Sequence, residues 1–310
     1  MLSRAAERIY WTGRYLERAE DTARLVQQYS QLLLDLPPEA GVDWRELVRI
    51  VGAARNFAAS GRPETEREIL EFLLADRDGP SSLAYSLRMA RENIRNTRDL
   101  LPQESWEFAN ELYQYANRHL AAAAAGENRF EILSECVVRC QGIIGILHGT
   151  MSRHSPYHFQ MLGQGLERAD MTSRIVDVAA AYIQHNERIV KRYGSSLWTN
   201  VLKSVSGFQM YRQFCQPEVE GERVIEFLLL DRAFPRAVAY CVDRCRATCG
   251  ELPRNDAARA ALDAVDALLV PIAPERMTAS DVSGLMDTVQ QKLGDVHAAI
   301  VATWLLPGDA

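Results

Sequence analysis

The chain has 310 residues, of which 47% are hydrophobic and 25% charged, and these values are typical of a globular protein with a sizeable core. Its formal net charge is -6, and it contains no basic tail or cluster of the kind that binds nucleic acid or an anionic membrane. The N-terminal residues include no apolar signal segment, and no stretch approaches the roughly 18 apolar residues of a membrane span, so we expect a cytoplasmic protein that binds neither nucleic acid nor membrane.

We expect the first element to be a long helix from about Ser3 to about Leu34, with Ser3 as its cap and Pro37 and Pro38 at its end. It contains the segment WTGRYLERAEDTARLV at residues 11–26, and 150 positions later the chain repeats it as MLGQGLERADMTSRIV at residues 161–176. The shared residues include Gly13, Leu16, Glu17, Arg18, Ala19, Thr22 and Arg24, which recur as Gly163, Leu166, Glu167, Arg168, Ala169, Thr172 and Arg174. A match of this density, with charged residues in register, indicates an internal duplication.

Both copies combine an apolar stripe with a polar stripe at the spacing of an α-helix. The polar stripes consist of Gly13, Glu17, Glu20 and Arg24 in the first copy and of Gly163, Glu167, Asp170 and Arg174 in the second. A glycine within a helix costs roughly 1 kcal/mol relative to alanine, so a glycine at the head of each stripe indicates that a neighbouring backbone or a ligand comes close. The polar stripes are therefore the best candidate for a binding site.

The charges of the stripes have two interpretations, and the sequence leaves both open. In the structural interpretation they neutralise one another. The pairs would be Glu20–Arg24 and Asp170–Arg174 within each helix or, if the two helices cross, Glu17–Arg174 and Glu167–Arg24. In the functional interpretation the same charges line a pocket for a ligand.

The rest of the first half also has helical periodicity. Helices are expected over residues 44–59, 64–74, about 81–102, 106–125 and 130–153. The helix that begins near residue 81 is rich in arginine, which is enriched at protein interfaces, and it is a candidate contact for a partner. Its arginines are Arg88, Arg91, Arg95 and Arg98.

The second half begins with a helix capped by Ser155, with Pro156 at the first helical position. The counterpart of the helix at 44–59 begins at Trp198, and the last helix covers residues 281–305. The segment EFLLADRDGP at 71–80 recurs as EFLLLDRAFP at 226–235, and no pair of segments alternates in the manner of strands. We predict an all-α single domain, 1–310, built from repeats 1–153 and 154–310 of about five or six helices each. Pseudo-twofold symmetry would set the two stripe helices against each other.

Two repeated Asp-Arg pairs, Asp76-Arg77 and Asp231-Arg232, lie in turns between predicted helices. An aspartate at such a position can accept hydrogen bonds from the free amides of the next helix, so we predict that both aspartates are caps. A contribution of these pairs to a central pocket is the alternative.

No metal or cofactor is predicted. The stripes contain Glu-x-x-Glu and Glu-x-x-Asp, but no histidine follows at the spacing of a dimetal helix bundle, and no phosphate-binding loop or nucleophile elbow is present. The cysteines fall inside helical patterns and are interpreted as small core residues in a reducing compartment. They are Cys136, Cys140, Cys215, Cys241, Cys245 and Cys249.

Three segments, MLSRAAERIYWTGRYLERAEDTARL, FQMLGQGLERADMTSRIVD and FLLLDRAFPRAVAYCV, resemble the bacterial alpha-E domain family. The resemblance implies an all-helical protein from gene clusters that also encode a circularly permuted ATP-grasp ligase and often a transglutaminase-like peptidase. It thereby implies a role in forming or modifying amide or peptide bonds. The residues that match the family's glutamate-bearing motif are Glu17, Arg18, Glu20 and Arg24, then Glu167, Arg168, Asp170 and Arg174. The second copy departs from the first at Gln164-Gly165, where the first has Arg14-Tyr15.

Two hypotheses follow. In the first, the protein is a non-catalytic partner of the ligase and presents a peptide or amino-acid-like acceptor in its charged groove. In the second, it is an enzyme that acts on amide or peptide substrates through Glu17 and Glu167. The sequence contains carboxylates but no recognisable pair of nucleophile and base, which favours the first hypothesis.

Overall fold

The computed structural model describes residues 3–185 and 187–306, and these residues form helices without any β-strand, as predicted. The first half contains α1 (Ser3–Asp35), η1 (Pro38–Ala40), α2 (Arg45–Ile50), α3 (Ala54–Ala59), α4 (Glu66–Leu70), the π-helical turn η2 (Glu71–Ala75), α5 (Leu83–Arg95), α6 (Gln103–Ala124) and α7 (Arg129–Thr150). The second half contains α8 (Ser155–His185), α9 (Glu187–Ser204), α10 (Phe208–Phe214), α11 (Gly221–Leu230), α12 (Val238–Gly250), α13 (Asp256–Leu269), η3 (Pro274–Arg276), α14 (Ala279–Ile300) and the π-helical turn η4 (Val301–Leu305). None of the described helices combines the length and the apolar character that a membrane span needs.

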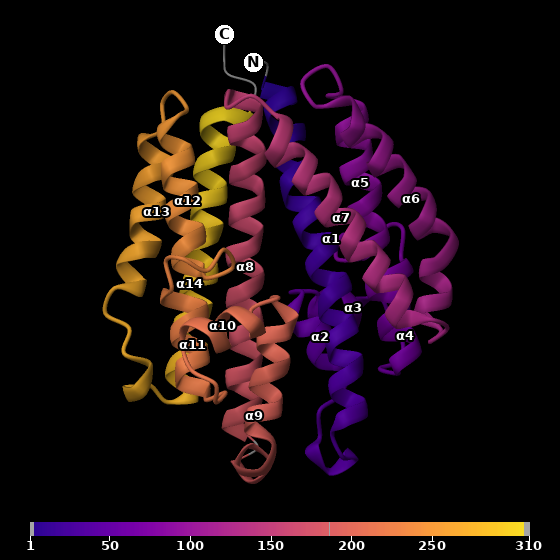
Figure 1. Ribbon diagram of the computed structural model, residues 1–310, viewed down its shortest axis with the longest axis vertical. Coiled ribbons are helices and arrows are strands. Elements are labelled where there is room, and N and C mark those ends of the chain that lie inside the picture. Colours follow the sequence, from indigo (N-terminus) through magenta and orange to yellow (C-terminus); the bar gives the residue numbers. More distant parts are fainter. Residues whose placement is uncertain (1–2, 186, 307–310) are drawn as a thin grey trace.

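Eight of the described helices form two groups of four. In the first group α1 packs against α5 and α7, and α6 packs against the same two helices from the other side. In the second group α8 packs against α12 and α14, and α13 contacts both of these. The two groups meet where α1 and α8 lie along each other in the middle of the molecule (Figure 1).

The apolar stripes explain why α1 and α8 are central. All members of both apolar stripes are buried. They are Ile9, Thr12, Leu16, Ala19, Ala23 and Val26 on α1 and Phe159, Leu162, Leu166, Ala169, Ser173 and Val176 on α8. Each helix therefore buries apolar side chains against its own group and still has a second face for the other long helix. That second face is the polar stripe, which consequently lies inside the protein.

Several predicted helix limits are wrong. The helix expected at 44–59 is divided into α2 and α3, because Gly52 adopts a left-handed conformation (φ 68°) that ends α2. Trp198 lies within α9 and does not begin a helix. Ser3 and Ser155 are the first residues of their helices and not the caps. A cap at Ser3 would make Leu2 a candidate hydrophobic-staple residue, and Leu2 lies outside the described residues.

Candidate functional site

The glycines at the head of the polar stripes mark the place where α1 and α8 touch. A methyl group added at Gly13 would collide with the backbone carbonyl oxygen of Gln160, and one added at Gly163 would collide with that of Tyr10. The prediction of a close neighbour is confirmed, and the neighbour is the backbone of the other helix. Only glycine allows this approach, and it brings the side chains one turn further along both helices into contact.

Replacing Gly163 with alanine should lower the free energy of unfolding by about 1–3 kcal/mol, because neither backbone can yield without separating the two helices. The matched control is Gly145→Ala in the middle of α7, where an added methyl group meets nothing within 4 Å. That change should instead stabilise the protein by roughly 0.5–1 kcal/mol, since it removes a helix-interior glycine. Urea unfolding of both variants tests the prediction, and equal effects of the two changes would contradict it.

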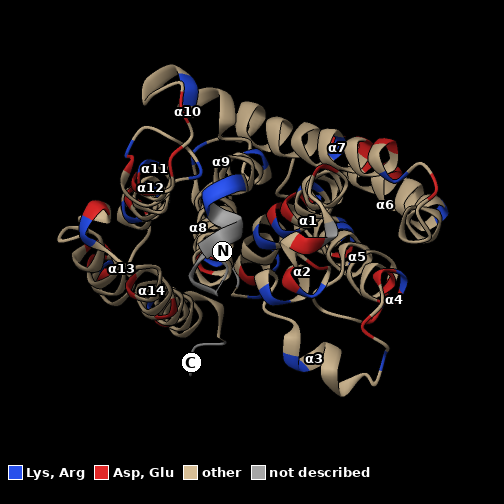
Figure 2. Cartoon of the chain, turned by 90° about the horizontal axis from the view of Figure 1, so that it is seen from below, with Lys and Arg blue, Asp and Glu red and all other residues tan. Residues whose placement is uncertain are grey.

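The pair Glu17-Arg18 of α1 and the pair Glu167-Arg168 of α8 bind each other reciprocally. Arg168 donates from Nε to Oε1 of Glu17 over 2.6 Å and from Nη2 to Oε2 over 2.9 Å. Arg18 donates from Nε to Oε1 of Glu167 over 2.5 Å and from Nη2 to Oε2 over 3.0 Å. Each carboxylate thus receives two charge-assisted bonds from the fork of an arginine on the opposite helix. Figure 2 shows the charged positions of α1 and α8 gathered in the middle of the bundle.

The structural interpretation of the sequence offered two sets of ion pairs for the stripe charges. The two pairs within one helix are confirmed, and the two pairs between the helices are wrong. Glu20 is bound by Arg24, and Asp170 accepts from Nε of Arg174 over 3.0 Å. Glu17 does not reach Arg174, and Glu167 does not reach Arg24. The helices touch at the glycines, so residues one turn further face each other, whereas the arginines at 24 and 174 lie about three turns away and remain with their own helix.

Another arginine, Arg236, lies in the turn that precedes α12 and contacts carboxyl groups of α1. Together with the charged residues that pair at the contact of α1 and α8, it forms what we call the α1–α8 cluster: Glu17, Arg18, Glu20, Asp21, Arg24, Glu167, Arg168 and Arg236. Its Nη1 lies 2.5 Å from Oδ1 of Asp21 and 2.9 Å from Oε1 of Glu17, and its Nη2 lies 2.8 Å from Oε1 of Glu20. Neither Arg236 nor Asp21 was predicted from the sequence as a member of this cluster. The only signal was the position of Arg236 directly after the repeated segment that ends at Pro235.

The departure between the two copies lies beside this cluster. Arg14 donates from Nε to Oε2 of Glu167 over 2.5 Å, and in the second copy Gln164 donates from Nε2 to Oε2 of Glu17 over 3.0 Å. At Gly165, an added Cβ would lie 2.7 Å from Sγ of Cys245, so this glycine allows α12 to pack closely on α8. The two glutamates therefore have similar geometry but different surroundings.

Both central glutamates are ionised. Burial by itself raises the pKa of Glu17, which is 0% exposed, but the charges of Arg168 and Arg236 outweigh burial and lower the pKa to about 2. The same opposition lowers the pKa of Glu167 to about 2, with Arg14 and Arg18 as the neighbouring charges. A carboxylate with such a low pKa and two bound arginines has no proton to give near neutral pH.

Asp21 has the opposite shift. Burial raises its pKa to about 7, the charge of Arg236 opposes the shift, and the negative charges of Glu17 and Glu20 reinforce it. The guanidinium of Arg236 contacts all three carboxyl groups, and Asp21 is the one without a second arginine partner. In agreement, Oδ2 of Asp21 is buried and has no hydrogen-bond partner among the described residues.

The Asp-Arg pairs cap turns and stay apart from this cluster. Oδ1 of Asp76 accepts from the amides of residues 78 and 79 over 3.0 Å each, and Oδ1 of Asp231 accepts from those of residues 233 and 234. These amides belong to the turns and not to the next helices. The prediction that the two aspartates cap the following helices is therefore wrong. Arg232 pairs with Asp243 and Asp266 on the surface, and the backbone carbonyl of Arg77 accepts from Arg88. Among the described residues, none of the four contacts the α1–α8 cluster by an ion pair or hydrogen bond.

The comparison with known families now agrees with the geometry. The Alpha-E family, described as a predicted alpha-helical domain with a conserved ER motif, matches residues 1–305. The chain belongs to the Alpha-E family. The Glu17-Arg18 and Glu167-Arg168 pairs fit the description of the motif, and in this Alpha-E chain they form the reciprocal contacts between α1 and α8.

Curated relatives of this Alpha-E chain are much longer than it is. An uncharacterized protein of Mycobacterium bovis and two uncharacterized proteins of Mycobacterium tuberculosis are each 21% identical to it. Each alignment covers 94% of this chain but 35% of the relative, so the chain spans about a third of the length of these proteins. No solved structure matches the chain significantly.

Among the described residues of this Alpha-E chain, no group of three or more His, Cys, Asp or Glu side chains is placed to hold a metal ion. Five of the six cysteines are buried, as predicted, and burial raises the pKa of Cys241 to about 12, so its thiol remains protonated. Cys215 is exposed at the end of α10, and its assignment to the core was wrong.

Proposed function

We propose that this Alpha-E chain is a non-catalytic component of a system that forms or modifies amide or peptide bonds, and that it binds a peptide or amino-acid-like acceptor. The observation that carries the proposal is that Glu17 and Glu167 are each already paired with two arginines. A general acid or base needs a pKa near the working pH and a free oxygen within reach of the substrate. Both glutamates have a pKa of about 2 and form ion pairs with two arginines, which argues against the alternative of an enzyme that uses them.

An ATP-grasp ligase is the partner that we propose, and a transglutaminase-like peptidase is a second one. The gene clusters implied by the family resemblance support this choice. The length of the mycobacterial relatives supports it as well, because there the similar region is joined to about twice its length of other sequence. We also propose a cytoplasmic location, which the unpaired cysteines support.

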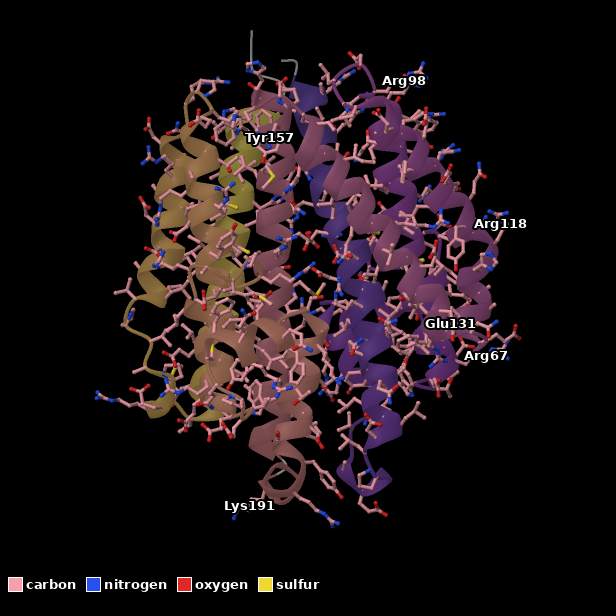
Figure 3. The ribbon with its side chains drawn as sticks, viewed as in Figure 1. Arg67, Arg98, Arg118, Glu131, Tyr157 and Lys191 are labelled. Carbon is pink, nitrogen blue, oxygen red and sulfur yellow. The ribbon has the colours of Figure 1, made fainter. Side chains whose placement is uncertain are left out.

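The arginine-rich segment offers less surface to a partner than its sequence indicated. Arg91 donates to Asn110 over 2.9 Å and lies over the ring of Trp106, so it serves the packing of α5 against α6. Arg95 pairs with Glu92 on the same helix. Arg98 lies beyond the end of α5, is exposed and has no ion-pair partner among the described residues (Figure 3), so we retain it as the contact candidate.

We propose further that the chain is one domain that arose by duplication, with repeats 1–153 and 154–310 related by a pseudo-twofold axis between α1 and α8. Three observations support this. Each repeat supplies one group of four long helices, connected in the same order. Each stripe glycine meets the backbone of the other stripe helix, and each Glu-Arg pair binds its counterpart.

Mixed with the ATP-grasp ligase of its own gene cluster, the protein should co-elute from a sizing column at micromolar concentration and low salt. By itself it should hydrolyse no ATP, because its sequence contains no phosphate-binding loop. Arg98→Glu should weaken co-elution, whereas the matched control Arg118→Glu, at an exposed position on α6, should not (Figure 3). Separate elution with an active ligase would remove the partner proposal, and ATP hydrolysis by this chain alone would favour the enzyme.

A further inference from the structure

A cavity of about 260 Å³ lies beside Glu167, on the side of the α1–α8 contact away from Arg236. Its charged wall is formed by Arg14 and Arg18 of α1 and by Asp170 and Arg174 of α8, and Val51, Pro80 and Met171 provide apolar wall. The side chain of Arg174 is 29% exposed and that of Glu167 only 3%. A solute that enters the cavity therefore meets arginine before it meets the central carboxylate.

The charges around the cavity do not cancel. Arg14 and Arg18 are both bound to Glu167, and Asp170 accepts a bond from Nε of Arg174. Three guanidinium groups thus face two carboxylates, which leaves one positive charge. Nη1 and Nη2 of Arg174 have no hydrogen-bond acceptor among the described residues, so the end of this side chain offers a free pair of donors.

The other side of the α1–α8 contact has one carboxyl group and one large side chain more than the cavity side, and this difference explains why the cavity side is open. The group around Glu17 contains three carboxyl groups and three arginines, namely Glu17, Glu20 and Asp21 with Arg24, Arg168 and Arg236. In the repeated segments Met171 takes the place of Asp21, and Ser81 takes the place of Arg236. The cavity side therefore lacks one buried carboxyl group and a large side chain, and open space remains where the protein supplies no partner.

Arg174 is held in position while its two Nη groups remain without an acceptor among the described residues. The Cβ that Gly52 lacks would lie 2.8 Å from Nη1 of Arg174, so a side chain at this position would push the guanidinium away from the end of α2. Asp170 fixes the same side chain from the other side through Nε. Fixing the arginine in advance lowers the entropic cost of binding an anion.

We propose that this cavity binds the carboxylate of a peptide or amino-acid-like molecule, with the free Nη donors of Arg174 as the main contact. The inference rests on the proposed binding function and names the ligand group. One surplus positive charge matches a monoanion better than a dianionic phosphate. Apolar wall beside the arginines favours an organic anion, and the planar guanidinium fits the two oxygens of a carboxylate.

The test is isothermal titration calorimetry of the full chain at fixed ionic strength with N-acetyl-glycyl-glycine, its C-terminal amide and inorganic phosphate as probes. We expect the acid to bind with a dissociation constant on the order of 1 mM or below, and the amide to bind about tenfold more weakly or worse. Arg174→Met, which removes the free donors, and Met171→Asp, which removes the surplus charge, should each weaken binding of the acid about tenfold or more.

The matched control is Arg24→Met, which changes the corresponding arginine of α1. Glu20 keeps Arg236 and Gln141 as partners, so this variant should fold and should bind the acid like the unchanged protein. Circular dichroism establishes whether each variant is folded. If Met171→Asp does not fold, the result for Arg174→Met alone decides the test. Equal binding of acid and amide, tighter binding of phosphate, or an equal loss in Arg24→Met would overturn the assignment. If the unchanged protein binds the acid but does not co-elute with the ligase, the proposal of a ligase partner is wrong and the cavity assignment is retained.

Discussion

Replacing Glu17 with glutamine should lower the free energy of unfolding by about 3–5 kcal/mol. Glu17 is fully buried and is the carboxylate to which Arg168 donates from both Nε and Nη2. The amide of glutamine leaves the guanidinium of Arg168 largely buried and without its counter-charge. Arg236 loses less, because it still faces Glu20 and Asp21.

The double variant Glu17→Gln with Arg168→Met should recover at least half of this loss, since it also removes the unpaired charge. Asp170→Asn is the matched control. Asp170 is partly exposed and has Arg174 as its ion-pair partner, so this change should cost less than about 1 kcal/mol. Urea titration measures the free energy of unfolding of all three variants. A Glu17→Gln protein as stable as Asp170→Asn would show that the cluster contributes little to the fold.

Glu17→Gln also separates a structural role from a binding role. The cavity lies beside Glu167 on the other side of the helix contact, so the folded fraction of the variant should still bind the carboxylate probe. The sequence alone assigned the two stripe glutamates the same role. The structure distinguishes them, because Arg236 lies beside one and an open cavity beside the other.

The sequence predicted the long helices and the central contact because both depend on local information. The apolar periodicity of α1 and α8 requires burial on one face, and a repeated glycine in a helix indicates a close neighbour. It predicted the ion pairs within each helix but not those between the two helices. Whether Glu17 reaches Arg168 or Arg174 depends on where along their length the two helices touch, and no residue pattern within one helix specifies that.

Arg236 and Gly52 show two other limits. Arg236 is 219 positions after Glu17 in the sequence, and only the packing of α12 on α8 brings it to the cluster. Gly52 lies inside a segment with helical periodicity, and its left-handed backbone ends α2 there. The apolar pattern alone does not distinguish a glycine that is tolerated in a helix from one that ends it.

Acidification should destabilise the protein steeply between about pH 4.5 and pH 2. Glu17 and Glu167 each have a pKa near 2 in the folded chain against 4.5 for an ordinary glutamate. Below pH 4.5 the unfolded chain takes up protons that the folded chain refuses, so the free energy of unfolding falls as the pH falls. A shift of that size corresponds to about 3 kcal/mol for each glutamate, all of it present above pH 4.5 and lost near pH 2.

Asp21 should produce the opposite slope at higher pH, and this separates it from the glutamates. Its pKa rises from 3.8 to about 7 on folding, so between these values the folded chain holds a proton that the unfolded chain has released. Its contribution to stability is therefore present below about pH 4 and is lost as the pH rises towards 7. Melting curves from pH 2 to pH 8 test both slopes. Asp21→Asn should abolish the decline towards neutral pH and keep the acid fall, whereas Glu17→Gln with Arg168→Met should reduce the acid fall by about half. A chain whose stability is flat from pH 5 down to pH 2 would show that the two glutamates are not the ionised, paired groups that hold α1 and α8 together.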